Sequence, residues 1–403
     1  MGLWRKAFNV CTWIICLWLV SLVSTKPYKG QPLKFPSPPA PIPAHIDITI
    51  VAVGDLISHQ DVQSAALKAE NGWASLWEEV TPLFKQADLA MANLETPIAP
   101  KTGRPGIPFC FNAPSNLASA LKETGVGLVF TANNHAFDQS VKGVAETLEH
   151  LDANDIKYAG SGLSRDAAES PVIMELRDGV RVAVLARTDI FNNNLNQRPD
   201  RPWVAALDAD GTERTIREIR SQVDLIMISV HWGNEYETLP NKRQRESAAR
   251  LIAAGADVLI GHHPHVLQPF EWIDSGGRRG AVAFSLGNFL SNQDRMYDPS
   301  AQPLSSGDSR DGGALVLTLR KDSSGVRLRD AYVEPLWTDN NWIQHTKGQN
   351  AKRIIRVLRT TPGERGADME DLLSKRRSRA LDRLRQSQNA GFAATSTELT
   401  GRD

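Results

Sequence analysis

Short apolar runs alternate with segments of helical periodicity along most of the chain, and this alternation limits the folds open to it. The strand-like runs lie at residues 46–54, 89–93, 128–132, 172–176, 181–186, 225–230, 258–260, 281–285, 314–319 and 327–333. Helical spacing of apolar residues occurs at 115–123, 140–152, 212–221 and 242–254. This alternation predicts an α/β fold with a largely parallel sheet covered by helices. The strand-rich stretch 258–335 predicts a second, more antiparallel sheet.

The charge and cysteine content narrow the possible partners and metal sites. Lys and Arg number 46 and so do Asp and Glu, so a nucleic-acid partner is not indicated. Cys11 and Cys16 fall in the N-terminal apolar stretch, which leaves Cys110 alone in the rest of the chain. A metal must therefore be held by His, Asp, Glu or Asn, which suits Zn, Mn or Fe better than a zinc–thiolate site.

The N-terminus has the pattern of an export signal. Arg5 and Lys6 precede an uncharged apolar run at 7–23, so residues 1–25 are predicted to be a signal peptide or an N-terminal membrane anchor. Residues 26–45 are rich in proline and predict an extended linker. We therefore expect an extracytoplasmic domain, anchored to the cytoplasmic membrane or secreted after cleavage.

The last part of the chain changes character. Residues 346–403 are predicted to form a tail, with a charged helix carrying a thin Leu stripe and a polar, disordered end. A solvated appendage is the favoured interpretation, and a partner-binding segment is the alternative. The domain between linker and tail then spans residues 46–345.

Five of the apolar runs end in a carboxylate, an amide or an imidazole. The residues that follow them are Asp55, Glu95, Asn134 with His135, His231, and His263 with His265. Asp and Asn after a strand are common helix caps, but Glu and His are not. Because ligand groups gather at the carboxyl ends of strands in open α/β sheets, we expect these side chains to form one site.

The strongest local signal is the segment Gly261-His262-His263-Pro264-His265. Two histidines separated by one residue can aim their imidazoles at one metal ion, whereas His262 is expected to be packed or hydrogen-bonded elsewhere. The alternative is a set of buried structural histidines.

Six motifs occur in an order that resembles a known family. They are Gly54-Asp55 with His59, Asn93-Leu-Glu95 with Pro97, Ala132-Asn-Asn134-His135 with Asp138, His231-Trp-Gly with Glu235-Tyr236, Gly261-His-His-Pro-His265, and Ser285-Leu-Gly-Asn-Phe289. They resemble the CapA family of capsule and poly-γ-glutamate biosynthesis proteins, which are similar to calcineurin-type metallophosphoesterases. The resemblance implies a metallophosphoesterase-like two-sheet α/β sandwich with flanking helices.

The resemblance also implies roles for individual residues. It assigns metal ligation to Asp55, His263 and His265, a bridging position to Glu95, and the second metal to Asn134 and His231. His135 would stand beside the metals as the proton donor or as a contact to the transition state. Two departures from the phosphoesterase pattern matter. His59 lies four residues after Asp55 rather than two, which weakens its assignment as a ligand. Asp138 follows His135 by three residues, and either orients His135 or caps the helix from residue 140.

The predicted function is that of a capsule or poly-γ-glutamate biosynthesis protein with a hydrolase centre of two divalent metal ions. The bond is a phosphoester or an amide. The rival interpretation is a non-catalytic, metal-binding accessory to the synthesis or export of an anionic polymer. Under both, the partners are an anionic polymer such as poly-γ-glutamate or its precursor, with membrane synthase or export subunits.

Three further features carry alternatives. Glu235 and Tyr236 either line the site or form a satisfied pair beneath His231. Asn288 either shapes the site wall or belongs to a turn, and the turn is favoured. The polar stretch 192–201 either covers the site or is an ordinary surface loop.

Overall fold

The computed structural model describes residues 45–104, 109–348 and 352–386. The predicted signal or anchor, the linker up to residue 44 and the polar end of the tail lie outside the described residues. Within the described ranges, no helix has both the length and the hydropathy that crossing a bilayer requires.

One sheet has eight strands. They are β1 (Ile46–Leu56), β2 (Leu89–Leu94), β3 (Val126–Phe130), β4 (Lys157–Ala159), β13 (Asn288–Leu290), β14 (Asp311–Asp322), β15 (Gly325–Asn340) and β16 (Ile355–Arg359). Their order is β16-β15-β14-β1-β2-β3-β4, and β13 pairs with β1. The strands from β1 to β4 are parallel, whereas β14, β15 and β16 continue the sheet as antiparallel neighbours.

The second sheet has six strands. They are β6 (Val172–Glu175), β7 (Arg181–Thr188), β9 (Leu225–His231), β10 (Val258–His262), β11 (Phe270–Ser275) and β12 (Arg278–Ala283), in the order β11-β12-β10-β9-β7-β6. The central four are parallel and the edges β11 and β6 are antiparallel. The short strands β5 (Ser161–Gly162) and β8 (Trp203–Val204) pair separately.

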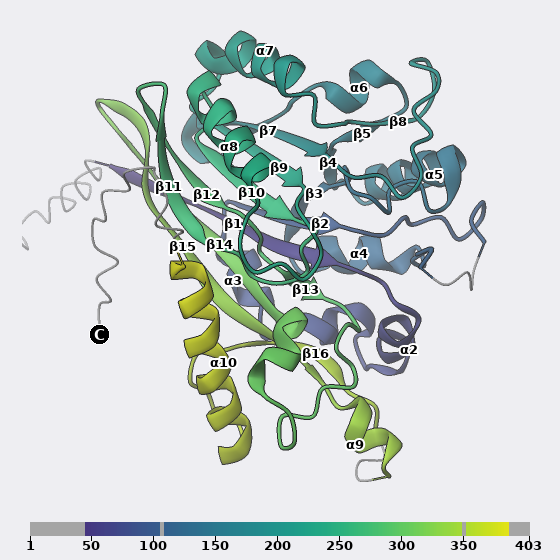
Figure 1. Cartoon of the computed structure of the whole chain (residues 1–403). Helices are drawn as coiled ribbons and strands as arrows, with labels where there is room; N and C mark the ends of the chain where they lie inside the picture. The colour runs from purple at the N-terminus through teal and green to yellow at the C-terminus, as the bar shows by residue number, and fades with distance from the viewer. Residues whose placement is uncertain (1–44, 105–108, 349–351, 387–403) are drawn as a thin grey trace, which may run out of the picture. The chain divides into compact units, whose positions relative to one another are not determined.

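Helices flank the two sheets (Figure 1). The α-helices are α2 (Gln60–Lys68), α3 (Thr81–Gln86), α4 (Asn116–Glu123), α5 (Ser140–Ala153), α6 (Arg165–Glu169), α7 (Ala209–Ile219), α8 (Lys242–Ala254), α9 (Trp342–Thr346) and α10 (Ala367–Arg385). The 3₁₀ segments are η1 (Gly72–Trp77), η2 (Arg177–Gly179), η3 (Arg220–Gln222) and η4 (Leu304–Arg310).

The central strands β7, β9 and β10 of the second sheet are buried on both faces. Along β7, Val182 and Val184 pack in the core shared with β1 and β2, whereas Ala183 and Leu185 pack against α7 and α8. This alternation places one core between the sheets and another under the helices, as the strand period of two requires. The predicted two-sheet α/β sandwich with flanking helices is confirmed.

The predicted division between the sheets is wrong in one respect. The stretch 258–335 does not form a separate antiparallel sheet, because β10 and β12 extend the parallel strands β7 and β9, while β14 and β15 join β1. Each sheet is therefore mixed, with a parallel centre. Strand propensity reveals where strands lie but not which long-range neighbour each will pair with.

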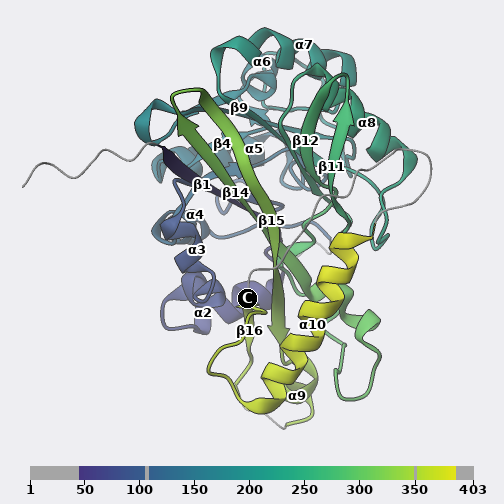
Figure 2. The same cartoon turned by 90° about the vertical axis from the view of Figure 1, so that its left-hand side faces the viewer.

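The charged tail helix exists, but α10 is not a solvated appendage. It lies against the β14–β15 hairpin (Figure 2), and its residues Leu373 and Ala380 are buried. Arg376 is also fully buried: its Nε donates to Asp311 Oδ1 at 2.9 Å, its Nη2 pairs with Asp311 Oδ2, and its guanidinium lies 4.4 Å from the Trp337 ring centroid. The thin apolar stripe of α10 is enough to dock the helix on the hairpin, because the buried Arg376–Asp311 ion pair and the Trp337 ring add to the contact.

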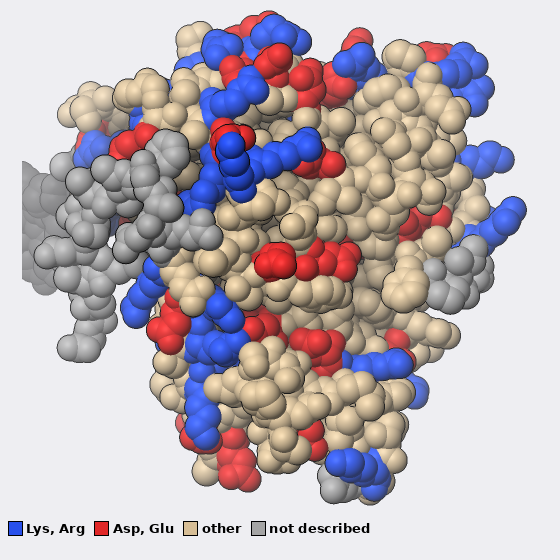
Figure 3. Space-filling model, viewed as in Figure 1, with Lys and Arg blue, Asp and Glu red and all other residues tan. Residues whose placement is uncertain are grey.

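Lys and Arg are interspersed with Asp and Glu over the face shown in Figure 3, including along α10. This agrees with equal numbers of acidic and basic residues in the sequence. Among the described residues, this face carries no continuous positive patch that would attract polyanions over its whole area. Recognition of an anionic ligand on this face would therefore require a local basic site.

Candidate metal centre

The predicted site residues meet at the carboxyl ends of both sheets. β1, β2 and β3 bring Asp55, Glu95 and the segment containing Asn134 to one edge, and β9 and β10 bring His231 and the 261–265 segment to the facing edge. Six of the nine histidines of the chain lie there, namely His59, His135, His231, His262, His263 and His265.

Asp55 is the most heavily bonded carboxylate of the site. Asn93 Nδ2 donates to its Oδ1 at 2.8 Å, and His262 Nδ1 lies 3.0 Å from the same oxygen. Its Oδ2 accepts from the His263 backbone N–H at 3.2 Å and lies 3.2 Å from His265 Nδ1. Burial opposes ionisation, but the imidazole hydrogen bonds prevail and hold the pKa of Asp55 well below its usual value. Asp55 is therefore an anion. His262 is hydrogen-bonded, as predicted, but its partner is Asp55 within the site rather than a group elsewhere.

Glu95 is the opposite case. It is completely buried, and burial together with the charge of Asp55 raises its pKa well above the usual value. Its Oε2 accepts a long hydrogen bond of 3.4 Å from Asn93 Nδ2, while its Oε1 has no hydrogen-bond partner. That unpartnered oxygen lies 3.7 Å from His231 Nε2 and 3.9 Å from His265 Nε2. A buried carboxylate this poorly satisfied is unfavourable unless a cation or a proton is supplied.

The end of β9 joins the site through His231. Its Nε2 lies 2.9 Å from Asn134 Oδ1, and its Nδ1 is buried without a partner. Burial, followed by the neighbouring His263, lowers the pKa of His231 well below the usual value. The ring is consequently neutral at pH 7, the state in which imidazole binds metals.

The turn after β10 is held in an unusual backbone conformation. His263 and His265 have φ angles of 95° and 58°, in the left-handed region that non-glycine residues rarely adopt. His265 Nδ1 lies 3.1 Å from Asn288 Oδ1, and Asn288 Nδ2 donates to the His265 carbonyl. Asn288 thus shapes the site wall, rather than only a turn. Such strain accumulates where side chains must be aimed precisely, as at ligand clusters.

Glycines set the spacing of the ligand-bearing segments. A Cβ on Gly54 would lie 2.0 Å from the carbonyl oxygen of Gly287, and a Cβ on Gly261 would lie 1.8 Å from that of Phe284. Both distances are far inside van der Waals contact. The close approach of β1, β10 and the segment before β13 therefore depends on the missing side chains.

The donor atoms form two neighbouring clusters among the described residues. Asp55, Glu95 and His231 each place one donor atom within 4.8 Å of the others, and so do Glu235, His263 and His265. Buried atoms without hydrogen-bond partners in this region include Glu95 Oε1, His231 Nδ1 and His263 Nδ1. Buried polar atoms are normally satisfied, so unpartnered atoms on residues of the two donor clusters fit divalent cations held by oxygen and nitrogen donors.

His135 and Asp138 form a pair beside the clusters. His135 Nδ1 lies 2.8 Å from Asp138 Oδ2, and the same oxygen accepts from the Phe111 backbone N–H at 2.6 Å. The side chain at the N-cap of α5 belongs to Gln139, which makes no capping bond. Of the two sequence alternatives, the structure therefore favours orientation of His135 by Asp138. With Nδ1 engaged, Nε2 is the ring nitrogen left for proton transfer.

His59 belongs to neither donor cluster. It precedes α2, its Nδ1 accepts from the Asn292 backbone N–H at 3.2 Å, and its ring lies 4.9 Å from that of Phe111. Burial, with His265 and His135 nearby, lowers the pKa of His59 to about 4. Metal ligation by His59 stays a prediction. Its contacts with Asn292 and Phe111 place it in the wall of the site.

Sequence reasoning missed or undervalued three residues. Phe111 packs its ring 4.3 Å from that of His135. Asn192, from the loop for which an ordinary surface position was the default, accepts from Asn134 Nδ2 at 3.3 Å and lies 3.4 Å from His135 Nδ1. Glu235 joins His263 and His265 in a donor cluster. Each comes from a loop, where no periodic pattern signals a contact, although the proximity of Glu235 to His231 in the sequence was a usable hint.

Comparison with known proteins identifies the family. The model of the bacterial capsule synthesis protein family PGA_cap matches residues 49–293. The chain belongs to the PGA_cap family. All six histidines of the site, with Asp55, Glu95 and Asn134, lie within the matched residues, so the donor clusters are part of the PGA_cap region.

Curated relatives carry the same assignment. The chain is 31% identical over 244 residues to the PGA biosynthesis protein CapA of Bacillus subtilis, covering 60% of this chain and 62% of that protein. It is 29% identical over 254 residues to the capsule biosynthesis protein CapA of Bacillus anthracis, covering 61% and 60%. The chain thus spans less than two thirds of the length of these relatives.

Two solved structures align with most of the chain at low scores. The calcineurin-like phosphoesterase YfkN of Bacillus subtilis aligns with 85% of this chain and all of its own, at a TM-score of 0.42 and 14% identity. A phosphatase from Mycoplasma pneumoniae aligns with 75% of this chain and 99% of its own, at a TM-score of 0.41 and 14% identity. Both scores are below 0.5, so the family assignment rests on the sequence match.

Proposed function

We propose that this PGA_cap protein is a metal-dependent hydrolase that acts on an anionic capsule polymer, such as poly-γ-glutamate, or on its precursor. The observation that carries the proposal is the pair of donor clusters, one with Glu95 and His231 and the other with His263, beside the oriented His135–Asp138 pair. Divalent metal ions in such sites polarise the scissile group and generate a nucleophile from water at neutral pH. Glu235 and Asn134 complete the set of donors available to them.

The protein's own residues supply the remaining chemistry. His135 is the proton donor to the leaving group, because Asp138 occupies Nδ1 and leaves Nε2 to transfer the proton. Asn192 and Phe111 restrict the movement of the His135 ring from two other directions. A purely metal-binding accessory would have no need for an imidazole fixed in this way, and this supports catalysis over the rival function.

The rival function is a metal-binding accessory in polymer synthesis or export. A Mycobacterium tuberculosis relative, 27% identical over 214 residues and covering 49% of this chain, is named a probable polyglutamine synthesis accessory protein. The His135→Ala variant separates the two functions. It should keep the fold and the bound metal but lose about 10²–10⁴-fold in turnover.

The experiment compares wild type, His135→Ala and the control His150→Ala, because His150 also lies beside a carboxylate, Glu146, but outside the centre. Purified metal-loaded protein is incubated with γ-linked polyglutamate and with a phosphodiester, and new amines and released alcohol are measured separately. The product whose release is lost in His135→Ala, amine or alcohol, identifies the bond that the protein cleaves. Wild-type polymer production by a deletion strain that expresses His135→Ala, with no hydrolysis defect on either substrate, would refute catalysis.

The proposed location is outside the cytoplasm, with residues 1–25 as a cleaved signal or an anchor. The support is the charge pattern of the N-terminus, where Arg5 and Lys6 precede the apolar run. A reporter enzyme that is active only outside the cytoplasm, fused after Ala44, should be active. Activity of a cytoplasmic reporter at the same junction would contradict this location.

A further inference from the structure

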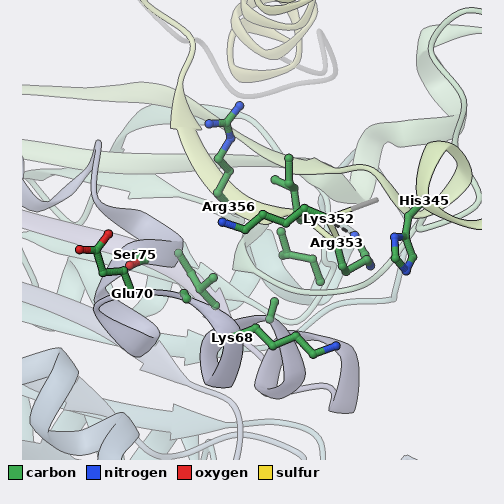
Figure 4. A pocket seen from close by; sticks show the side chains of 12 residues that line it. Lys68, Glu70, Ser75, His345, Lys352, Arg353 and Arg356 are labelled. Carbon is green, nitrogen blue, oxygen red and sulfur yellow. Dashed lines mark hydrogen bonds between the residues drawn. The ribbon is translucent and has the colours of Figure 1, made fainter. Parts of the chain in front are cut away.

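A basic cavity lies between α2, η1 and the segment around β16. Its volume is about 590 Å³, and the charged residues that line it are Lys68, Glu70, Lys352, Arg353 and Arg356. Figure 4 shows the basic side chains spread along the cavity rather than gathered at one point. Four of these five residues are basic, whereas acidic and basic residues are equal in number over the whole chain.

Arg353 is the most informative of these residues. Its guanidinium is half-buried and donates to the side-chain oxygens of Asn341 and Asn292, at 3.2 and 3.3 Å, and to the carbonyl of Ile354. All three acceptors are neutral, and the buried Nε has no partner among the residues that the structure describes. Burial lowers the pKa of Arg353. A partly desolvated cation without a carboxylate is unfavourable, and an anionic ligand would offset this cost.

Lys68 adds a second available charge. It is exposed in the last turn of α2, and no carboxylate of the described residues lies within ion-pair distance of it. Arg356 differs, because its Nε pairs with Asp339 at 3.0 Å. Thus at least Lys68 and Arg353 can each offer a charge to a ligand in the cavity.

The cavity is connected to the metal centre through Asn292. The Asn292 side-chain oxygen accepts from Arg353 Nη2, and its backbone N–H donates to Nδ1 of His59 in the wall of the centre. One residue therefore contacts both sites.

We propose that this cavity is a binding subsite for a run of carboxylates, such as successive residues of an acidic polymer. Spread charges suit an extended polyanion better than a single phosphate, and a planar guanidinium pairs well with carboxylates. The proposal rests on the proposed function for the identity of the polymer, but the binding itself is independent of catalysis. The subsite would hold the polymer while the donor clusters act on a neighbouring bond.

The test uses the full chain and a fluorescent γ-linked oligoglutamate as the probe, with affinity measured by anisotropy. Lys68→Glu should weaken binding about tenfold, because it turns an attraction into a repulsion at an exposed position. Lys85→Glu is the matched control, since Lys85 is also an exposed basic residue in the last turn of a helix, α3. Arg353→Gln, which keeps an amide donor for the asparagines, should weaken binding as well.

Equal affinities for Lys68→Glu, Lys85→Glu and wild type would overturn the proposal. Inorganic phosphate that displaces the probe as effectively as unlabelled oligoglutamate, at equal total charge, would also overturn it in favour of a single-anion site. If wild-type protein binds the probe but hydrolyses neither substrate, the binding subsite is supported and only the proposed hydrolase activity is refuted.

Discussion

The Arg376–Asp311 pair under α10 and the carboxylate–imidazole clusters at the strand ends are both deeply buried, but they differ in how fully their atoms are paired. Arg376 donates to both Asp311 oxygens and to the carbonyls of Leu304 and Gly307. At the strand ends, Glu95 Oε1 and His263 Nδ1 have no partner. A buried charge that is fully satisfied holds structure together, whereas one left open indicates a missing ligand.

The strongest test of this contrast removes the open donors. His263→Ala with His265→Ala should abolish stoichiometric metal binding, because both imidazoles belong to one donor cluster. Elemental analysis of the purified protein measures the metal. His45→Ala with His150→Ala is the control, since both residues lie outside the clusters. Full metal occupancy in the first variant would place the site elsewhere.

Disruption of the fully paired Arg376–Asp311 ion pair should lower the stability of the protein and leave its metal content unchanged. Arg376→Met leaves Asp311 buried without its cation and should lower the free energy of unfolding by about 3–5 kcal/mol. Arg379→Met is the control on the same helix, because Arg379 pairs with Asp308 nearer the surface and should cost below about 1 kcal/mol. Urea unfolding measures both. Equal losses for the two variants would show that burial does not distinguish them.

Acid should destabilise the metal-free centre through His263. Burial lowers the pKa of His263 to about 4, against 6.5 for the unperturbed side chain. Between these values the unfolded chain binds the proton and the folded protein does not, so stability falls as pH falls from 6.5 towards 4. From pH 6.5 to 5 the loss should be about 2 kcal/mol. Metal-free His263→Asn should lose less over this range. An identical pH dependence in both proteins would contradict the assigned pKa.

The smallest effect concerns a paired charge at the surface. The hydrogen bond from Arg320 lowers the pKa of Asp47 to about 2, so the pair adds stability above about pH 4 and loses it as pH falls towards 2. Asp47→Asn should cost below about 1 kcal/mol at pH 7, since the carboxylate is one-third exposed. The difference in urea midpoint from wild type should vanish near pH 2. A difference that persists there would have a cause other than charge.

The features that the sequence could predict are those that depend on a local pattern of residues. Asp55, Glu95 and His231 follow apolar runs, and parallel strands bring their carboxyl ends to one edge, so a local pattern was enough to group them. Helices α5 and α8 were likewise predictable, because their apolar spacing is sustained over several turns.

Pairing between distant segments was not predictable. The addition of β14 and β15 to the sheet of β1, the burial of Arg376 and the arrival of Asn192 at His135 all depend on contacts between residues far apart in the chain. In addition, the many charged residues of α10 predict a solvent-exposed helix. The sequence does not show that Arg376 is paired, because its partners Asp311 and Trp337 lie on other elements.

The glycines behind the centre have a consequence for how such a site can evolve. Gly54 and Gly261 bind nothing, yet a single methyl group on either would force apart the backbone segments that carry Asp55 and His263. Substitution at these positions would change the separation of all the donors together, whereas substitution of one donor changes a single bond. A lineage that adapts this centre to another metal or bond is therefore expected to exchange donors such as Glu95 one at a time and to inherit the glycine framework intact.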